Sequence, residues 1–443
     1  MMWRRLSLMA IMSVFCATAH GKETAAAQRL SARERQAVLQ AVEAAIAKNY
    51  VFPDLRAKII ERLEQAQRAG RYDDDDSRVF AARVTEDLRA DSHDRHLSLR
   101  ADPAAYAAAM APEDSDDGES AFQREGARQD HHGLAELKIL PGNIRYLRIT
   151  EFEWIDDETG RVYDDTMRFL KDGDAVVIDI RGNPGGSHAA VRYLVSHFMD
   201  GDVFEMTFLA GSETPEQSRT LEYLPAGRLK GKPLYVLIDD RDASAAEAFA
   251  YDVKQFKLGQ LVGVKTAGAA NNNKLLPIAP AFILSVSYGR PVHAVSQTNW
   301  EGVGIAPDVE ATSRQALDVA EAVALKQLSE TPGASRERLA AYAWAQTAVD
   351  VRLHPAVLAP AALKAWVGHY GKPNVGFGQV EVAFRDGSLW LIRPDRPLAR
   401  LSPLTTDGLF AIEGSEMLRA RLTRATLELL WATDPEPHVF LRQ

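Results

Sequence analysis

Ser244 stands between an apolar run and a helix, a position where a serine can act as a nucleophile. The run from Leu234 to Ile238 is typical of a fully covered strand, and the aspartate-rich residues 239–242 supply a turn before an alanine-rich helix. Free amide groups and the dipole at a helix N-terminus favour developing negative charge. A structural alternative is open, because serine is a preferred N-cap and Glu247 would complete a capping box. The segment therefore predicts either a nucleophile or a helix cap.

A glycine-rich turn follows a second apolar run. Residues 175–180 are again typical of a buried strand, and they lead into the turn at residues 181–186. Gly185 and Gly186 have no side chain, so backbone amides can approach a ligand closely there. Such amides could line a phosphate nest or an oxyanion hole, and the spacing matches neither a Walker loop nor a dinucleotide fingerprint. Next to Ser244, the amides of Gly186 and Ala245 become candidates to converge on one carbonyl oxygen.

A serine nucleophile needs a base, and His96 is the candidate that the chain offers. It lies at the end of a helical stretch, with His93 close by in sequence. A third segment, the glycine-rich turn around Glu301, supplies a carboxylate that could orient the histidine or bind a substrate amine. Asp308, in the same segment, follows a proline and is equally suited to capping a turn.

Other polar clusters have simpler explanations. Adjacent histidines such as His131 and His132 rarely point to one metal centre, so we expect them in a loop. The aspartate run at residues 73–76 lacks the Gly and the terminal Glu of a calcium loop, which indicates a solvated turn. Cys16 is the only cysteine, so a chain without it has neither a disulfide nor a thiolate metal site. We expect no metal and no other cofactor.

Composition limits the partners. A formal charge of −9, from 52 Lys and Arg against 61 Asp and Glu, argues against nucleic acid and anionic membranes as partners, although a local basic pocket is compatible with it.

At the N-terminus, a positive start, an apolar stretch and the small residues Ala17 to Ala19 predict a signal peptide over residues 1–19. A retained membrane anchor is the alternative, but the apolar run is shorter than the roughly 20 residues of a spanning helix. We therefore expect a periplasmic or secreted protein with no membrane span after cleavage.

The elements that must position these residues change character along the chain. Apolar spacings and a capping box at Ser31 and Glu34 predict helices in the first part of the chain. Strands then alternate with helices, which is typical of an α/β core with a parallel sheet. The last part of the chain has short strands separated by turns. Aromatic residues such as Trp366 and Tyr370 are expected in the core of the last part. The predicted organisation is a helical N-terminal domain at 28–100, a connector or flap at 101–130, a core at 131–328 and a small antiparallel, mainly β domain at 335–443.

The three segments together resemble the tail-specific, or C-terminal-processing, serine peptidase family. The resemblance rests on the Asp-x-Arg-Gly-Asn-Pro-Gly-Gly turn at 179–186, Ala-Ser-Ala-Ala-Glu at 243–247, Val-Gly-Val-Lys-Thr-Ala-Gly at 262–268 and Glu-Gly-Val-Gly-Ile-Ala-Pro-Asp at 301–308, in family order. It covers roughly residues 30–325 and implies a ClpP/crotonase-like spiral of strands and helices for the α/β core. The PDZ module of many members is not evident.

One departure bears on the mechanism. Members of the family that use a lysine base have it in a Phe-Gly-Lys-Gly turn, whereas this chain has Ala269 at that position, and neither Lys265 nor Lys274 matches it. The pattern is more similar to the branch that contains tricorn protease and the interphotoreceptor retinoid-binding protein, which implies a histidine base supported by a glutamate. His96 and Glu301 take those places. Tricorn has a serine just before its histidine, and Arg95 stands there in this chain.

The resemblance implies an exported serine-type peptidase that acts on a peptide or protein substrate. The implied catalytic residues are Ser244, His96 and Glu301, and the implied oxyanion-hole residues are Gly185, Gly186 and Ala245. The alternative is a non-catalytic binding protein of the same fold for hydrophobic ligands or peptides, as in the retinoid-binding relatives. A binding protein that had lost catalysis would be expected to lose the serine or the histidine, and this chain keeps both.

Overall fold

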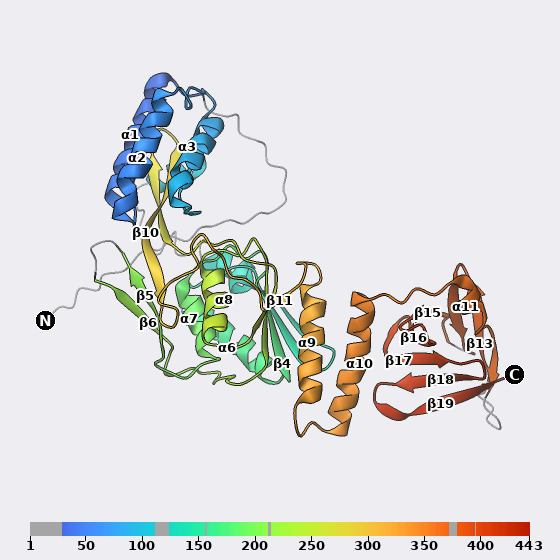
Figure 1. The fold of residues 1–443 in the computed structure, drawn as a ribbon. Helices are drawn as coiled ribbons and strands as arrows, with labels where there is room; N and C mark the ends of the chain where they lie inside the picture. Colours follow the sequence, from blue (N-terminus) through green and yellow to red (C-terminus); the bar gives the residue numbers. More distant parts are fainter. Residues whose placement is uncertain (1–28, 111–123, 156, 211–213, 372–378, 395) are drawn as a thin grey trace. The chain divides into compact units, whose positions relative to one another are not determined.

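The computed structural model describes residues 29–110, 124–155, 157–210, 214–371, 379–394 and 396–443 (Figure 1). The predicted signal peptide and the middle of the predicted connector lie outside these residues. The chain divides into two compact units. The first comprises residues 1–138, 145–172 and 176–313, and the second comprises residues 139–144, 173–175 and 314–443. None of the helices in the described ranges combines the length and the hydropathy that crossing a bilayer requires.

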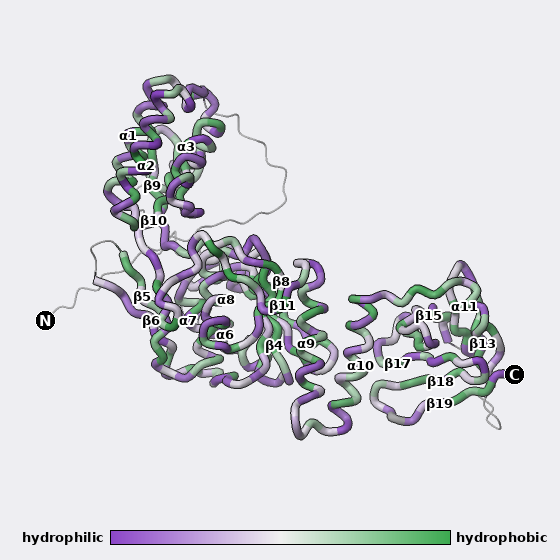
Figure 2. The backbone as a smooth tube through the Cα atoms, in the orientation of Figure 1, coloured by the Kyte–Doolittle hydropathy of each residue, from purple (hydrophilic) through white to green (hydrophobic). Residues whose placement is uncertain are grey.

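The N-terminal helices form because an apolar stripe alternates with polar residues, which Figure 2 shows as bands of green and purple. The capping box is confirmed: the Ser31 hydroxyl accepts from the Glu34 amide at 3.2 Å, and the Glu34 carboxylate accepts from the Ser31 amide at 2.7 Å. Asp76 caps the third helix, so the aspartate run forms a turn and a cap. The elements of this region are α1 (Ala32–Asn49), α2 (Pro53–Arg68), α3 (Ser77–Ser92), β1 (Ser98–Ala101) and α4 (Pro103–Met110).

The core contains the parallel sheet that the sequence predicts. Its six strands have the order β11-β8-β7-β4-β3-β2, and β4, β7, β8 and β11 pair in parallel. Every residue of β4 and β7 is buried, as expected for strands covered on both faces. The elements are η1 (His131–Gly133), β2 (Leu134–Leu140), β3 (Ile144–Ile149), α6 (Asp157–Lys171), β4 (Ala175–Asp179), α7 (His188–Ser196), β7 (Leu234–Ile238), α8 (Ala245–Gln255), β8 (Gln260–Gly263) and β11 (Val309–Glu310).

A second sheet joins the helices to the core through one long strand. Strand β10 (Phe282–His293) pairs over residues 282–289 with β9 (Asn272–Ile278), and over residues 290–293 with β5 (Phe204–Leu209). Strand β1 pairs with the outer half of β10, and β6 (Glu216–Arg219) pairs with β5. Apolar residues of β10 such as Phe282 and Leu284 belong to the core of α1–α3. Strand β10 therefore connects the helical layer to the strands of the core.

The C-terminal unit contains two long helices and a closed barrel. The predicted antiparallel β structure is confirmed, and the strands close because β12 pairs with β19 as well as with β13. Tyr370 is buried, and Trp366 packs edge-on against Phe410, so these aromatics are core residues. The elements are α9 (Ala316–Glu330), α10 (Arg336–Leu353), α11 (Pro360–Lys364), β12 (Gly368–Gly371), β13 (Gln379–Arg385), β14 (Ser388–Ile392), β15 (Ala399–Pro403), β16 (Leu409–Ile412), β17 (Ser415–Leu422), β18 (Thr426–Trp431) and β19 (Asp434–Arg442).

Candidate active site

Ser244 is the last residue of the turn between β7 and α8, and its backbone conformation is unusual. Its φ of 55° and ψ of −119° lie outside the regions that residues with a side chain normally occupy. Its hydroxyl makes no capping hydrogen bond to α8. Its amide donates to the carbonyl of Ala269 at 2.9 Å, which holds the residue in place. The Ser244 hydroxyl therefore does not cap α8, and a strained serine at a helix start is a feature of nucleophile turns.

The glycine turn lies directly against Ser244. A Cβ on Gly185 would be 2.7 Å from the Cβ of Ser244, and a Cβ on Gly186 would be 2.2 Å from the carbonyl oxygen of Phe152. Both glycines also have φ above 100°. The turn is fixed by the Phe152 amide, which donates to the Gly185 carbonyl at 2.8 Å. Only residues without a side chain fit here, because the serine turn and Phe152 fill the space on both sides.

Two backbone amides next to Ser244 are available to a ligand. Within the described part of the chain, the amides of Gly186 and Ala245 donate no hydrogen bond, and Ala245 is the first residue of α8. The Gly185 amide is already engaged, because it donates to the Asn183 side chain at 2.8 Å. Free amides at a helix start can stabilise the negative oxygen that forms when a carbonyl is attacked.

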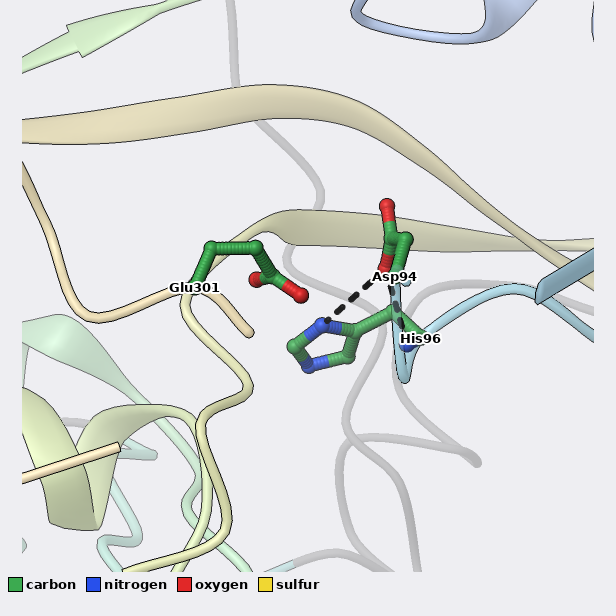
Figure 3. A group of neighbouring side chains, drawn as sticks. All are labelled: Asp94, His96 and Glu301. Carbon is green, nitrogen blue, oxygen red and sulfur yellow. Dashed lines mark hydrogen bonds and ion pairs between the residues drawn. The ribbon is translucent and has the colours of Figure 1, made fainter. Parts of the chain in front are cut away.

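His96 lies on the loop that leaves α3, and the preceding carboxylate sets its orientation. Asp94 is 1% exposed, and its Oδ1 accepts from the backbone amide of His96 at 2.9 Å. The same oxygen is 3.9 Å from Nδ1 of the His96 ring. Figure 3 shows that the carboxylates of Asp94 and Glu301 approach the ring edge that carries Nδ1, whereas Nε2 points away from both. This orientation leaves Nε2 free to accept a proton from elsewhere.

A short segment after β8 connects the serine, the glutamate and the histidine loop. The Ala269 carbonyl accepts from the Ser244 amide. The next two amides, of Ala270 and Asn271, donate to Glu301 Oε2 at 2.6 and 2.9 Å. The side-chain amide of Asn271 then donates to Asp94 Oδ2 at 3.0 Å. Residues 269–271 therefore bring three predicted site residues to one place, although no hydrogen bond joins Ser244 to His96 within the described residues.

Burial shifts the pKa values of His96, Glu301 and the neighbouring Tyr50. Removal from water lowers the pKa of His96, and the negative charge of Asp94 partly opposes that shift. Burial, and then the charge of Asp94, raise the pKa of Glu301 to about 7. Burial also raises the pKa of Tyr50, which is fully buried beside Asp94. His96 is therefore neutral at neutral pH, which is the form that can accept a proton.

The same three side chains have the geometry of a cation site. One ligand atom from each of Asp94, His96 and Glu301 lies within 4.8 Å of the others. Both oxygens of Asp94 and Oε2 of Glu301 already accept from protein N–H groups, whereas Glu301 Oε1 and His96 Nδ1 are buried without a hydrogen-bond partner among the described residues. Two carboxylates and an imidazole are donor types that divalent metals use, so a metal there would compete with the histidine for its role as a base.

Asp94 and Asn271 lie at the site, but the sequence motifs do not indicate them. A carboxylate two residues before the candidate histidine was the available signal for Asp94, since that spacing permits a turn in which the aspartate accepts from the histidine amide. Asn271 had no comparable signal, because its partner is far away in the sequence.

Several other polar residues have structural partners. Asp308 accepts from Lys254 and from the amide of Leu261. His188 contacts Ser218 at 3.0 Å, and His132 contacts Thr159 at 3.0 Å.

Two family models match the chain. Residues 143–311 match peptidase family S41, and residues 25–130 match the N-terminal domain of peptidase S41 in eukaryotic IRBP. The carboxy-terminal processing protease CtpB of Bacillus subtilis is 26% identical over 146 residues, which are 32% of this chain and 29% of the relative. A probable CtpA-like serine protease of Staphylococcus aureus is 26% identical over 128 residues, which are 29% of this chain and 25% of the relative.

Among solved structures, the crystal structure of the tricorn protease matches with a TM-score of 0.43 and 12% identity, over 66% of this chain and 37% of the tricorn chain. The chain spans less than a third of the length of the CtpB and CtpA-like relatives. Its own S41 match contains the glycine turn, Ser244 and Glu301, and its N-terminal match contains His96. The two matches, in this order, place the chain in peptidase family S41.

Proposed function

We propose that the protein is a serine peptidase in which Ser244 is the nucleophile. The observation that carries this proposal is the strained Ser244 at the start of α8, packed against Gly185 and flanked by the unused amides of Gly186 and Ala245. Family S41 membership agrees with this activity. The arrangement suits attack on a carbonyl carbon, because nucleophile and oxyanion donors belong to adjoining turns.

The proposed reaction has two steps. Ser244 Oγ attacks the carbonyl carbon of a peptide bond while its proton passes to Nε2 of His96, and the amides of Gly186 and Ala245 hold the resulting oxyanion. The C–N bond then breaks, and the leaving amine takes the proton from His96. Water attacks the acyl-enzyme with His96 again as base, which releases the carboxylic acid product and regenerates the serine.

Asp94 and Glu301 are proposed to position His96. Asp94 holds the backbone and faces the Nδ1 edge of the ring, and Glu301 faces the same edge (Figure 3). The Asn271 bridge supplies a link between these carboxylates in a chain where Arg95 replaces the linking serine of the tricorn pattern. A carboxylate at Nδ1 stabilises the imidazolium that forms when Nε2 takes the serine proton.

The test is covalent labelling of the full chain by a fluorophosphonate probe. We expect wild type to be labelled, Ser244→Ala to give background only, and His96→Ala to react roughly 10²- to 10⁴-fold more slowly, because the general base is lost. Lys265→Ala is the matched control for a lysine base, and it should react at the wild-type rate because Lys265 is exposed. Wild-type labelling no stronger than that of Ser244→Ala would rule out the serine nucleophile.

A test with metal ions distinguishes a histidine base from a metal site at Asp94, His96 and Glu301. If the histidine acts as a base without a metal, treatment with EDTA leaves the labelling rate unchanged, and added Zn²⁺ lowers it by occupying Asp94, His96 and Glu301. Loss of labelling with EDTA and recovery with Zn²⁺ would instead assign the cluster to a metal.

Export is part of the proposal. The N-terminal pattern of residues 1–19 supports it, and the absence of a membrane-spanning helix from the described residues agrees with it. Mass spectrometry of the protein produced with its own N-terminus should give a chain that begins after Ala19. A mature mass that retains residues 1–19 would contradict a cleaved signal.

A further inference from the structure

A cavity of about 610 Å³ is lined by residues of α1, α2, β5, β9 and β10, and all the charged side chains in its described lining are cations. Four cations line it, namely Lys48, Arg56, Lys274 and Arg290, together with Tyr288. Among the residues that the structure describes, no carboxylate belongs to its lining, in a chain whose formal charge is −9. Its volume falls in the range of small-molecule and peptide-side-chain sites. Such a concentration of positive charge favours an anionic ligand.

Three of the four cations contact neutral groups. The Arg56 guanidinium donates to the carbonyls of Tyr50 and Ala47, at the end of α1, at 2.8 and 3.1 Å. Lys274 lies 5.6 Å from the centre of the Tyr288 ring. Arg290 lies 5.6 Å from the centre of the Phe52 ring.

These contacts orient the side chains without neutralising them. Among the described residues, none of the four cations forms an ion pair with a carboxylate. The cavity therefore holds positive charge that a ligand can balance, at little cost in side-chain order for the two cations that stack on aromatic rings.

The cavity forms where β10 changes partners. Lys274 is on β9, which pairs with the outer half of β10, and Leu209 is at the end of β5, which pairs with the inner half. Lys274 is three residues from Asn271, whose side chain binds Asp94 of the proposed site. At about 3.3 Å per residue of extended chain, the two backbone positions are roughly 10 Å apart. An extended peptide covers this distance with about three residues.

We propose that this cavity binds carboxylate groups of an acidic peptide segment, several residues away from the bond that is cleaved. The inference rests on the proposed peptidase function for its link to catalysis, and on the four unneutralised cations for its ligand. The carboxylates are those of Asp or Glu side chains or the α-carboxylate of the peptide. The cavity then selects peptides by charge, while the oxyanion site acts on any backbone carbonyl.

Binding is measured separately from cleavage, with full-length Ser244→Ala protein and a fluorescein-labelled peptide that contains three adjacent glutamates. The control peptide has glutamine at the same positions. We expect the acidic peptide to bind roughly tenfold more tightly or better in fluorescence anisotropy, as hydrogen bonds to charged groups imply. The preference should shrink as NaCl rises from 50 to 500 mM, because salt screens these charges. Equal affinity for the two peptides at low salt would overturn the proposal.

Variants locate the binding site. Lys274→Gln and Arg290→Gln, each in the Ser244→Ala background, should lose most of the preference for the acidic peptide, and Lys274→Arg should retain it. Lys326→Gln is the matched control, because it removes the same charge from an exposed position on α9. Lys48→Gln, at an exposed helix end, serves as a second test that leaves the interior of the fold untouched. An undiminished preference in the Lys274, Arg290 and Lys48 variants would assign the acidic peptide to another site and overturn the proposal.

Two further arms define the ligand and its link to catalysis. Amidation of the peptide C-terminus distinguishes an α-carboxylate ligand, whose affinity it abolishes, from side-chain carboxylates, whose affinity it leaves. The acidic peptide should also slow fluorophosphonate labelling of wild type, and this protection should require more peptide in Lys274→Gln. Binding without protection would refute the placement next to the cleaved bond. Absence of any labelling would count against the peptidase proposal and leave the binding result intact.

Discussion

In the proposed mechanism, His96 depends on the carboxylates at one edge of its ring. The charge of Asp94 raises the pKa of the histidine, whereas burial lowers it further than Asp94 can restore. Proton transfer from Ser244 requires the neutral ring, so the labelling rate should fall as pH falls through the histidine pKa, below its ordinary value of 6.5. If the ring had to be protonated to act, the labelling rate would instead rise as the pH falls.

Asp94→Asn tests this electrostatic role. Removal of the negative charge lets burial lower the His96 pKa further, so the midpoint of the pH–rate profile for fluorophosphonate labelling should move to lower pH. The plateau rate should fall by roughly tenfold or more, because the ring loses a group that orients it. Glu301→Gln is the comparison, because it resembles the protonated glutamate that prevails below about pH 7 and should move the midpoint less. A midpoint that does not move in Asp94→Asn would leave Asp94 a merely structural role.

At the scale of elements, the turn after β4 and the turn after β7 must fit against each other without an intervening side chain. Gly185→Ala would place a Cβ 2.7 Å from Ser244, so the two turns must separate. We expect the labelling rate to fall by about 100-fold, because nucleophile and oxyanion donors lose their alignment. Gly231→Ala is the matched control: its φ is also positive, but no atom lies within 4 Å of the added Cβ. Both variants are strained at the backbone, so only a loss of rate confined to Gly185→Ala supports this account.

Sequence patterns predicted the parts of the site that lie within one segment. The apolar runs of β4 and β7 and the turns after them are local signals for Gly186 and Ser244, and the glycine-rich turn at 301–304 is a separate local signal for Glu301. The Asn271–Asp94 bridge was not predictable in this way, because its two partners meet only after the helical layer packs on β10. The cavity lined by Lys48 and Lys274 escaped for the same reason, since each lysine alone reads as an ordinary surface charge. Closure of the barrel likewise depends on the pairing of its first and last strands.

At the scale of the whole molecule, the C-terminal unit includes more than the C-terminal sequence. Residues 139–144 and 173–175, which flank the core strands β3 and β4, belong with α9, α10 and the barrel in one compact unit. Within that unit the Tyr342 hydroxyl donates to Asp174 at 2.8 Å, and Tyr342 is 3% exposed. A few residues of the S41 match at 143–311 therefore belong to the same compact unit as α9, α10 and the barrel.

Tyr342 gives a measure of this support. Tyr342→Phe should lower the free energy of unfolding by about 1 kcal/mol through loss of one hydrogen bond, and Tyr342→Ala by roughly 3 kcal/mol or more through loss of buried area. Thermal unfolding followed by circular dichroism should show the same order in its midpoints. Tyr223→Phe, at a site that is 80% exposed, should have no effect. Equal midpoints for wild type and Tyr342→Ala would show that α10 contributes no stability to this unit.

In the proposed mechanism, the bridge from Asn271 to Asp94 also makes activity depend on the packing of the helical layer. The serine turn is built from segments of the core, whereas the proton acceptor arrives on a loop from the helical layer, and the bridge is a contact between the two. A chain whose helical layer has not yet packed has a formed serine and no base beside it. Under the proposed mechanism such a chain would be inactive, so a newly made chain would be unable to cleave itself or its neighbours before the helical layer packs.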